Sequence, residues 1–474
     1  MKNITLLIPM LLFSIGSFCQ NKHGNIWVNG ALKYFKTDFG TNPPINMVLQ
    51  TNSNILFDHG HSNICDSAGN LILMSNGLNI YKSNGDTIDG GYRVTDSIFH
   101  DLGSPGLGYA QESLFLPLGN DKYFFVNPIP SDSLFAELLA NPSLPIGWRD
   151  ILYCSIVDMK ANGGAGKVVK KKVKLLSGVK MAYTQMMACR HGDGKSWWLL
   201  KQAHDTNMVY KFLITEDTVY GPYLQGFADP HFGIFHNGGQ SVFTLDGTKY
   251  ATTARGAGKV FVADFDRCSG MLSNPQTYVV PAPAIYYADG SFAGHDETTE
   301  SAAFSPNGRF LYVGKYNAIV QLDLQAANPA IAWDTIAKLD TTWAQFTEYS
   351  TMYLGPNGRL YIGNWHGTSS EMSVINEPNK KGALADFCPR CLSFPSLNGV
   401  SVTAPPNMAN YLLGPTNPPC TVGLNDAVAN ELKVEIYPNP TTGRIWIKYE
   451  MPQTSDTWLH ITDMHGKQVW KGKL

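Results

Sequence analysis

One design recurs six times along this chain and limits the possible folds more than any other feature. A short apolar strand leads into a turn centred on glycine, and a second strand rich in aromatic and β-branched residues follows. The copies are ICDSAGNLILMS (from Ile64), LFLPLGNDKYFFVN (from Leu114), MACRHGDGKSWWLLK (from Met187), VFTLDGTKYATT (from Val242), AAFSPNGRFLYVG (from Ala302) and MYLGPNGRLYIGN (from Met352). Turns containing Pro-Asn-Gly suit tight hairpins, because proline fixes φ and the Asn-Gly pair accepts positive φ.

A third alternating strand follows each hairpin, as in the stretches from Lys259 and Ala318, and a weaker fourth strand often follows, as in Ala330–Leu339. Four short antiparallel strands repeated at roughly fifty to sixty residues are typical of β-propeller blades. One such sheet cannot bury both faces alone, so blades must pack side by side in a ring. The sequence therefore predicts an all-β fold, with a β-propeller over residues 20–413.

Seven blades are predicted, with six and a simpler closure as the alternative. The seventh blade combines both ends of the propeller: a hairpin of NIWVNG (from Asn25) and ALKYF (from Ala31), a strand from Ile45, and an inner strand from Gly399–Leu413. Pairing the two ends would lock the ring shut. The stretch from Pro128 to Asp150 has helical periodicity at its centre and is interpreted as an insertion on one face of the ring.

The first 19 residues are typical of a secretory signal peptide. Lys2 supplies the positive charge, Ile4–Phe18 is an apolar region too short to span a bilayer comfortably, and Ser17 and Cys19 are small residues before the expected cleavage at Gln20. A membrane anchor is the alternative for this stretch. No other stretch is apolar enough to cross a membrane, so no stable membrane span is expected.

Export would place the remaining cysteines in an oxidising compartment. Cleavage removes Cys19 from a total of eight, and the odd number left means that at least one is unpaired or intermolecular. Cys388 and Cys391 form a CxxC motif without a second ligand pair for zinc and without a thioredoxin-like context. A structural disulfide is favoured there, either between these two residues or with Cys420.

Charge and motifs exclude several classes of function. The chain has 36 Lys and Arg against 38 Asp and Glu, which gives no electrostatic footprint for nucleic acid or an anionic membrane. The sequence contains no G-x-S-x-G elbow, phosphate-binding loop or dinucleotide fingerprint in a suitable context. No cofactor is therefore expected.

The repeats also resemble a known group of proteins. LYCSIVDMKANGGAGKVV (Leu152–Val169), FVADFDRCSGMLSNP (Phe261–Pro275) and the two Pro-Asn-Gly hairpins resemble secreted propellers of Bacteroidetes-type bacteria, which are related to gliding-motility-associated and YVTN-type repeat proteins. The resemblance covers most of residues 25–413. It implies a fold rather than a function, because members of this family are mostly uncharacterised.

After a Pro-, Asn- and Gly-rich linker over residues 414–431, the stretch VEIYPNPTTGRIWIKYE and the later LHITDMHGKQVW resemble the type A C-terminal sorting domain of the type IX secretion system. The matching motif residues are Tyr437, Pro438, Asn439, Pro440, Gly443, Asp463 and Gly466. The resemblance implies a partial Ig-like β-sandwich over residues 432–474 and recognition by the outer-membrane translocon, followed by release or attachment to the cell surface. A generic immunoglobulin-like end module is the alternative.

Members of the sorting family continue beyond this point with further strands. The sequence therefore predicts a C-terminally truncated fragment of a longer product, since the sandwich would otherwise keep an unpaired edge.

Polar residues in the expected connections between blades are candidates for a loop site, because such loops gather at the ends of a propeller. They are His59, His61, His231, His236, His295 and Asp296. An acid–base or metal site is conceivable, but the alternative is that these are ordinary polar loop residues. No metal site and no catalytic residue is assigned.

The predicted protein is secreted or on the cell surface, where its propeller acts as a binding platform for a protein or glycan. Aromatic residues that could line a groove are Trp197, Trp198, Tyr220, Tyr223, Tyr286, Tyr287, Trp343 and Trp365. The alternative is an exported hydrolase or lyase that uses loop His and carboxylate groups at one face of the ring. Fold alone cannot decide, since propellers carry both kinds of function.

Overall fold

The computed structural model describes residues 22–30, 34–52, 55–95, 98–101, 106–141, 148–204, 206–226, 238–256, 258–282, 284–286, 291–328, 331–339, 348–365, 370–394, 404–420, 433–437, 446–450, 458–462 and 468–473. The chain divides into two compact units, Met1–Thr421 and Val422–Leu474. The predicted signal peptide lies outside the described residues.

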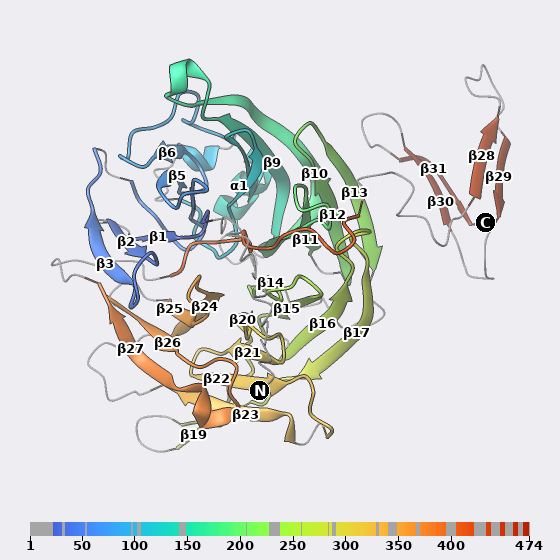
Figure 1. Ribbon diagram of the computed structural model, residues 1–474. Coiled ribbons are helices and arrows are strands. Elements are labelled where there is room, and N and C mark those ends of the chain that lie inside the picture. Colours follow the sequence, from blue (N-terminus) through green and yellow to red (C-terminus); the bar gives the residue numbers. More distant parts are fainter. Residues whose placement is uncertain are drawn as a thin grey trace, which may run out of the picture. The chain divides into compact units, whose positions relative to one another are not determined.

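Antiparallel sheets follow one another in chain order around a ring in the first unit (Figure 1). The first two contain β1 (Ile26–Asn29), β2 (Tyr34–Asp38) and β3 (Ile45–Leu49), then β4 (Ser62–Cys65), β5 (Leu71–Ser75) and β6 (Ile80–Lys82). A seven-stranded sheet follows with β7 (Leu114–Gly119), β8 (Lys122–Ile129), β9 (Trp148–Asp158), β10 (Lys167–Arg190), β11 (Trp197–Ala203), β12 (Met208–Ile214) and β13 (Val219–Gly226).

Three four-stranded sheets complete the ring. They are β14 (Ser241–Phe243), β15 (Lys249–Ala254), β16 (Lys259–Phe265) and β17 (Leu272–Val279); β20 (Ser301–Phe304), β21 (Phe310–Gly314), β22 (Ala318–Asp323) and β23 (Trp333–Lys338); and β24 (Tyr349–Leu354), β25 (Leu360–Asn364), β26 (Glu371–Ile375) and β27 (Phe387–Ser393). The fold is an all-β propeller, as predicted. Its described strands form seven blades when the seven-stranded sheet is counted as two blades that share β10.

Strand β10 belongs to two blades because it changes partners along its length. Its first part pairs with β9 as far as Ala182, and its last part pairs with β11 at Met181 and from Met186 to Arg190. The register shifts between Met181 and Met186, where Gln185 has a φ of 50°. Such irregularities bend a strand, so one continuous segment can leave one blade and enter the next.

Local turn chemistry explains why the six predicted hairpins form. In the turn between β20 and β21, Gly308 has a φ of 69°, and its amide donates to the carbonyl oxygen of Ser305 at 2.9 Å. The Asn307 side-chain oxygen accepts from the amide of Arg309 at 3.1 Å. Glycine takes the left-handed conformation without a Cβ clash, so this sequence closes a tight turn.

Apolar side chains between neighbouring blades form the core, and the same kind of packing closes the ring. The ring of Trp27 lies 5.4 Å from that of Tyr361, and Phe35 lies 5.6 Å from Phe394, so the first and last blades are in contact. The Asn46 amide also donates to the carbonyl oxygen of Ser393 at 2.7 Å. Buried aromatic surface of this kind stabilises a closed ring that no single blade could stabilise.

The predicted helical insertion is confirmed as α1 (Asp132–Ala140). The Ser131 side chain accepts from the amide of Leu134 at 3.2 Å, so it caps the first turn. A separate hairpin of β18 (Ala284–Tyr286) and β19 (Phe292–His295) precedes β20. Short 3₁₀ turns, η1, η2 and η4, cover Ile98–His100, Asn162–Gly164 and Gly382–Ala385.

The prediction that Gly399–Leu413 supplies an inner strand is wrong for its described part. Residues 404–413 form no strand. The Asn407 amide donates to the His61 carbonyl oxygen at 3.1 Å, but this bond is not part of a ladder. Pro405 and Pro406 lack backbone donors, so this stretch cannot form a regular ladder.

The second unit contains two hairpins, β28 (Lys433–Tyr437) with β29 (Trp446–Glu450) and β30 (Trp458–Thr462) with β31 (Gln468–Lys473). In the first hairpin Tyr437 pairs with Trp446. Within the described part of the chain, no helix has the length and apolar character needed to cross a bilayer.

Candidate functional site

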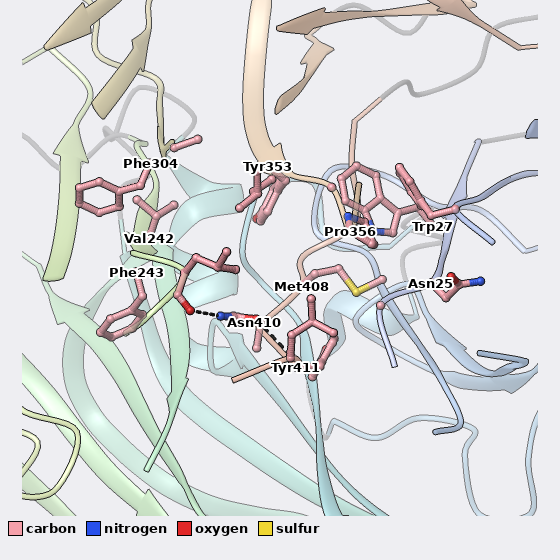
Figure 2. Close-up of a pocket in the computed structure, with 18 of the residues that line it drawn as sticks. Asn25, Trp27, Val242, Phe243, Phe304, Tyr353, Pro356, Met408, Asn410 and Tyr411 are labelled. Atoms are coloured by element: carbon pink, nitrogen blue, oxygen red, sulfur yellow. Dashed lines mark hydrogen bonds between the residues drawn. The ribbon is translucent and has the colours of Figure 1, made fainter. Parts of the chain in front are cut away.

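A cavity of about 370 Å³ lies where the innermost strands of several blades meet the C-terminal segment of the propeller (Figure 2). Strand β14 contacts β10 and β20, and β20 contacts β24, so these strands line the axis of the ring. Pockets of about 300–1,000 Å³ are typical of small-molecule sites. Because its walls come from separate blades, the cavity exists only in the closed ring.

Aromatic and other apolar side chains make up most of the cavity wall. Figure 2 shows Phe243, Phe304, Tyr353, Trp27 and Tyr411 around the same space. Phe243 ends β14, Phe304 ends β20 and Tyr353 lies near the end of β24. The hairpin turn that follows each of these strands fixes the end of the strand, and therefore fixes where its last side chain points.

The segment over residues 404–420, here called the C-terminal strap, forms one wall of the cavity. Asn407 donates to the carbonyl oxygen of Ser113 at 2.9 Å and accepts from the Tyr353 hydroxyl at 2.9 Å. The Tyr411 hydroxyl donates to the carbonyl oxygen of Phe115 at 2.8 Å. These bonds fasten the strap to blades far away in the sequence, because the strap has no strand partner of its own.

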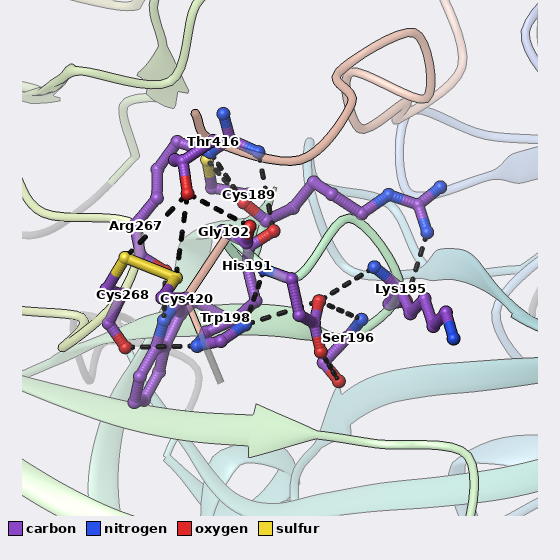
Figure 3. Close-up of polar contacts among 12 residues, drawn as sticks. Cys189, His191, Gly192, Lys195, Ser196, Trp198, Arg267, Cys268, Thr416 and Cys420 are labelled. Carbon is purple, nitrogen blue, oxygen red and sulfur yellow. Dashed lines mark hydrogen bonds and ion pairs between the residues drawn. A yellow bond between two sulfur atoms is a disulfide. The ribbon is translucent and has the colours of Figure 1, made fainter. Parts of the chain in front are cut away.

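A disulfide between Cys268 and Cys420 fixes the far end of the strap (Figure 3). The Thr416 amide donates to the carbonyl oxygen of Gly192 at 3.0 Å, and Arg267 donates to the carbonyl oxygen of Gly414. The strap is therefore attached to the turns of two neighbouring blades as well as to the axis.

The cysteine predictions are corrected by this bond. Cys420 does not pair with Cys388 or Cys391, because the strap crosses towards the turn that contains Cys268. Cys388 and Cys391 are free thiols on β27, and the Cys391 sulfur lies 3.5 Å from the carbonyl oxygen of Cys388. Partial burial and the neighbouring Cys388 thiol raise the pKa of Cys391 to about 12, so its thiol is protonated at neutral pH.

Two glutamine side chains connect inner strands that lie two blades apart. Gln111 donates to the carbonyl oxygen of Ser241 at 2.8 Å and accepts from the amide of the same residue at 2.8 Å. Gln240 makes the same pair of bonds with Met352, at 2.8 Å and 3.1 Å. Each side-chain amide donates to and accepts from the backbone of one residue, as a residue of a neighbouring strand would. These bonds hold the inner strands together across the middle of the ring.

A buried ion pair lies beside these glutamines. Arg149 donates from Nε to Glu112 Oε1 at 2.8 Å, and its Nη2 lies 2.6 Å from the same oxygen. Burial raises the pKa of Glu112, while Arg149 acts against that rise. Lys201 is fully buried nearby and donates to the Thr184 carbonyl oxygen, and burial lowers its pKa to about 7.

Sequence reasoning missed Glu112, Arg149 and Lys201, although a signal for Glu112 exists. A polar or aromatic residue directly precedes a serine at the start of five inner strands, as His61-Ser62, Glu112-Ser113, Gln240-Ser241, Glu300-Ser301 and Tyr349-Ser350. Aligning the repeats on that serine would have shown that the residue before it, such as Glu112 or Gln240, occupies an equivalent position in each blade.

The predicted loop histidines at 59 and 61 are buried and bonded to the backbone. His59 lies with Nδ1 at 2.8 Å from Asp58 Oδ1 and Nε2 at 3.1 Å from the Asn364 carbonyl oxygen. His61 lies with Nδ1 at 2.6 Å from the Asp58 carbonyl oxygen and Nε2 at 2.8 Å from that of Val28. Burial lowers the pKa of His61 to about 4, so its ring is neutral at pH 7.

The other predicted loop residues do not join them. His295 is exposed, and its Nδ1 lies 2.9 Å from the carbonyl oxygen of Ala282. Asp296 is buried and accepts from the amides of Thr298 at 3.0 Å and Asn317 at 3.2 Å. His231 and His236 lie outside the described residues. Among the residues that the structure does describe, no group of three or more His, Cys, Asp or Glu could hold a metal ion.

Of the eight aromatic residues singled out from the sequence, the five whose side chains the structure describes do not line the cavity, and nothing is described of the side chains of the other three, Tyr286, Tyr287 and Trp343. Trp197 and Trp198 are buried between blades, and Tyr220 and Tyr223 are partly exposed on β13. The Trp365 ring stacks on His59 at 4.7 Å. The cavity is lined instead by aromatic residues at the ends of inner strands, such as Phe243, Phe304 and Tyr353. The sequence predicted hairpins for these residues but no binding role.

Most of the predicted sorting motif falls outside the described residues. Tyr437 ends β28, whereas Pro438, Asn439, Pro440, Gly443, Asp463 and Gly466 lie in stretches that the structure does not describe.

Comparison with known proteins finds a family match at the C-terminal end of the chain. Residues 435–474 match the family of secretion system C-terminal sorting domains. The match supports export of this chain, to the medium or to the outer-membrane surface, with involvement of the type IX secretion machinery. No curated protein matches the chain.

Solved structures with a similar fold share little sequence with the chain. A protein of Bacteroides fragilis proposed to be a 6-phosphogluconolactonase is 11% identical, with a TM-score of 0.43, over 74% of this chain and 90% of that one. A protein from Lactobacillus plantarum is 11% identical, with a TM-score of 0.41, over 80% and 97%. Apo AztD from Citrobacter koseri is 10% identical, with a TM-score of 0.35, over 81% and 98%. Likenesses this distant say nothing about the ligand or reaction of this chain.

Proposed function

We propose that this protein is an exported binding protein that holds a small ligand in its central cavity. The type IX translocon recognises its sorting domain, and the propeller is then released or attached to the cell surface. The observation that carries the proposal is the cavity itself, which the ends of inner strands and the C-terminal strap build together. The four described candidates, His59, His61, His295 and Asp296, are bonded to nearby backbone groups and do not support the alternative of a hydrolase or lyase.

A cavity-filling variant tests the proposal. Ala409 is buried in the strap and lines the cavity, so Ala409→Phe would fill it. The matched control is Ala136→Phe on the exposed side of α1. Full-length protein is incubated with the low-molecular-mass fraction of growth medium, separated by gel filtration and denatured, and the released compounds are identified by mass spectrometry. We expect a compound that the wild type and Ala136→Phe retain and Ala409→Phe loses. If no compound depends on the cavity, the proposed function is wrong.

Export has its own test. Deleting residues 433–474 is expected to abolish delivery to the surface and the medium, and the propeller should accumulate in the periplasm, since residues 435–474 carry the sorting match. Cell fractionation and immunoblotting measure the outcome in a host that has the translocon. The control substitutes Lys448→Ala on β29, which leaves the motif residues intact. Equal export of the deleted and full chains would contradict this prediction.

A further inference from the structure

Four hydrogen-bonding side chains of the cavity wall, those of Asn25, Tyr353, Asn410 and Tyr411, already make bonds within the protein. The Asn410 amide donates to the Leu245 carbonyl oxygen at 2.6 Å, and its oxygen accepts from the Leu412 amide at 3.1 Å. The hydroxyls of Tyr353 and Tyr411 are used by the strap, as described above. The Asn25 amide donates to Asp38 at 3.2 Å. A sugar or phosphate entering this space would lose its water and would have to compete with these bonds for its partners.

The rest of the cavity wall is mostly apolar and can contact a ligand by van der Waals packing rather than by hydrogen bonds. Met187, Met352 and Met408 complete the lining with the rings of Trp27, Phe243 and Phe304. Methionine and aromatic side chains adapt to apolar and aromatic groups and attract them by dispersion. Among the lining residues that the structure describes, Lys22 is the one cationic side chain, and it is exposed.

We infer that the cavity binds a compact apolar group, of which a bicyclic aromatic ring is the best representative; this inference rests on the proposed function. An apolar cavity of about 150 Å³ is enough for benzene, so about 370 Å³ accommodates two fused rings. The group can belong to a free small molecule or to an aromatic side chain of a peptide. Both sources present the same chemistry to Trp27, Phe304 and Met408.

Isothermal titration calorimetry with defined probes tests the inference on full-length protein. Indole represents the free molecule, N-acetyltryptophanamide represents the side chain, and glucose and glucose 6-phosphate represent polar ligands. We expect indole, N-acetyltryptophanamide or both to bind the wild type and Ala136→Phe. We expect Ala409→Phe to weaken that binding at least about tenfold, because the added ring takes the space of the ligand. Binding of indole alone identifies a free small molecule as the ligand.

Met408→Trp serves as a second cavity-filling variant if Ala409→Phe does not fold, and near-ultraviolet circular dichroism checks the folding of both. Binding of a sugar or sugar phosphate that both substitutions abolish, without binding of indole or N-acetyltryptophanamide, would overturn the apolar ligand class and keep the proposed function. Aromatic binding that neither substitution weakens would overturn the inference as well. If no probe binds, the ligand class is wrong, and the retention experiment with growth medium then decides the proposed function separately.

Discussion

Replacing Arg149 with methionine is expected to lower the free energy of unfolding by about 3 to 5 kcal/mol, the usual cost of leaving a buried charge without its partner. Glu112 is fully buried and takes both contacts of the guanidinium on one oxygen, at 2.8 and 2.6 Å. Methionine fills much of the same volume as arginine. The decrease in the free energy of unfolding is therefore caused by the unpaired charge of Glu112 and not by a new cavity. Chemical denaturation at pH 7 measures the change.

The pH dependence gives this prediction a specific signature. Without Arg149 the pKa of Glu112 rises further above its unfolded value, because burial already raises it and the opposing cation is gone. The folded variant then binds a proton that the unfolded chain does not, so its deficit against the wild type shrinks as the pH falls from 8 towards 5.

The double variant Arg149→Met with Glu112→Gln is the control for this experiment, since it removes both charges and should recover most of the loss. A double variant as unstable as Arg149→Met alone, with no dependence on pH, would show that the ion pair is not the cause.

The sequence predicted the parts of this fold that depend on short-range chemistry. Strand alternation and turns such as Ser305-Pro306-Asn307-Gly308 act over a few residues, so the hairpins and the blades they begin were found from the repeat. Helix α1 was found for the same reason, because its periodicity lies within one turn-bounded stretch.

The candidate site could not be predicted in this way, because it depends on contacts between distant segments. Cys268 and Cys420 are separated by 152 residues, and nothing in their local sequences distinguishes them from the CxxC pair. The strap closes the ring through side-chain contacts rather than as the inner strand predicted for Gly399–Leu413, because Pro405 and Pro406 prevent a regular ladder. Its contacts are made by side chains such as Asn407, which no periodicity reveals.

Breaking the Cys268–Cys420 disulfide is expected to lower the free energy of unfolding by up to about 5 kcal/mol. Loop-closure entropy for a cross-link over 152 residues gives this size, because the bond restricts the unfolded chain much more than the folded one. Cys420→Ser and reduction of the wild type should have the same effect, whereas reduction should leave the variant unchanged. Denaturant unfolding with and without reductant measures it.

Cys391→Ser is the matched control, because Cys391 is an exposed free thiol. If the wild type unfolds at the same denaturant concentration with and without reductant, the disulfide does not contribute as predicted. Hydrogen exchange locates the effect: Cys420→Ser should speed exchange along the strap while the amides of Phe310–Gly314 stay protected. Since Met408 to Leu412 form a cavity wall, the same variant should also weaken ligand binding, which links the stability of the strap to the function of the propeller.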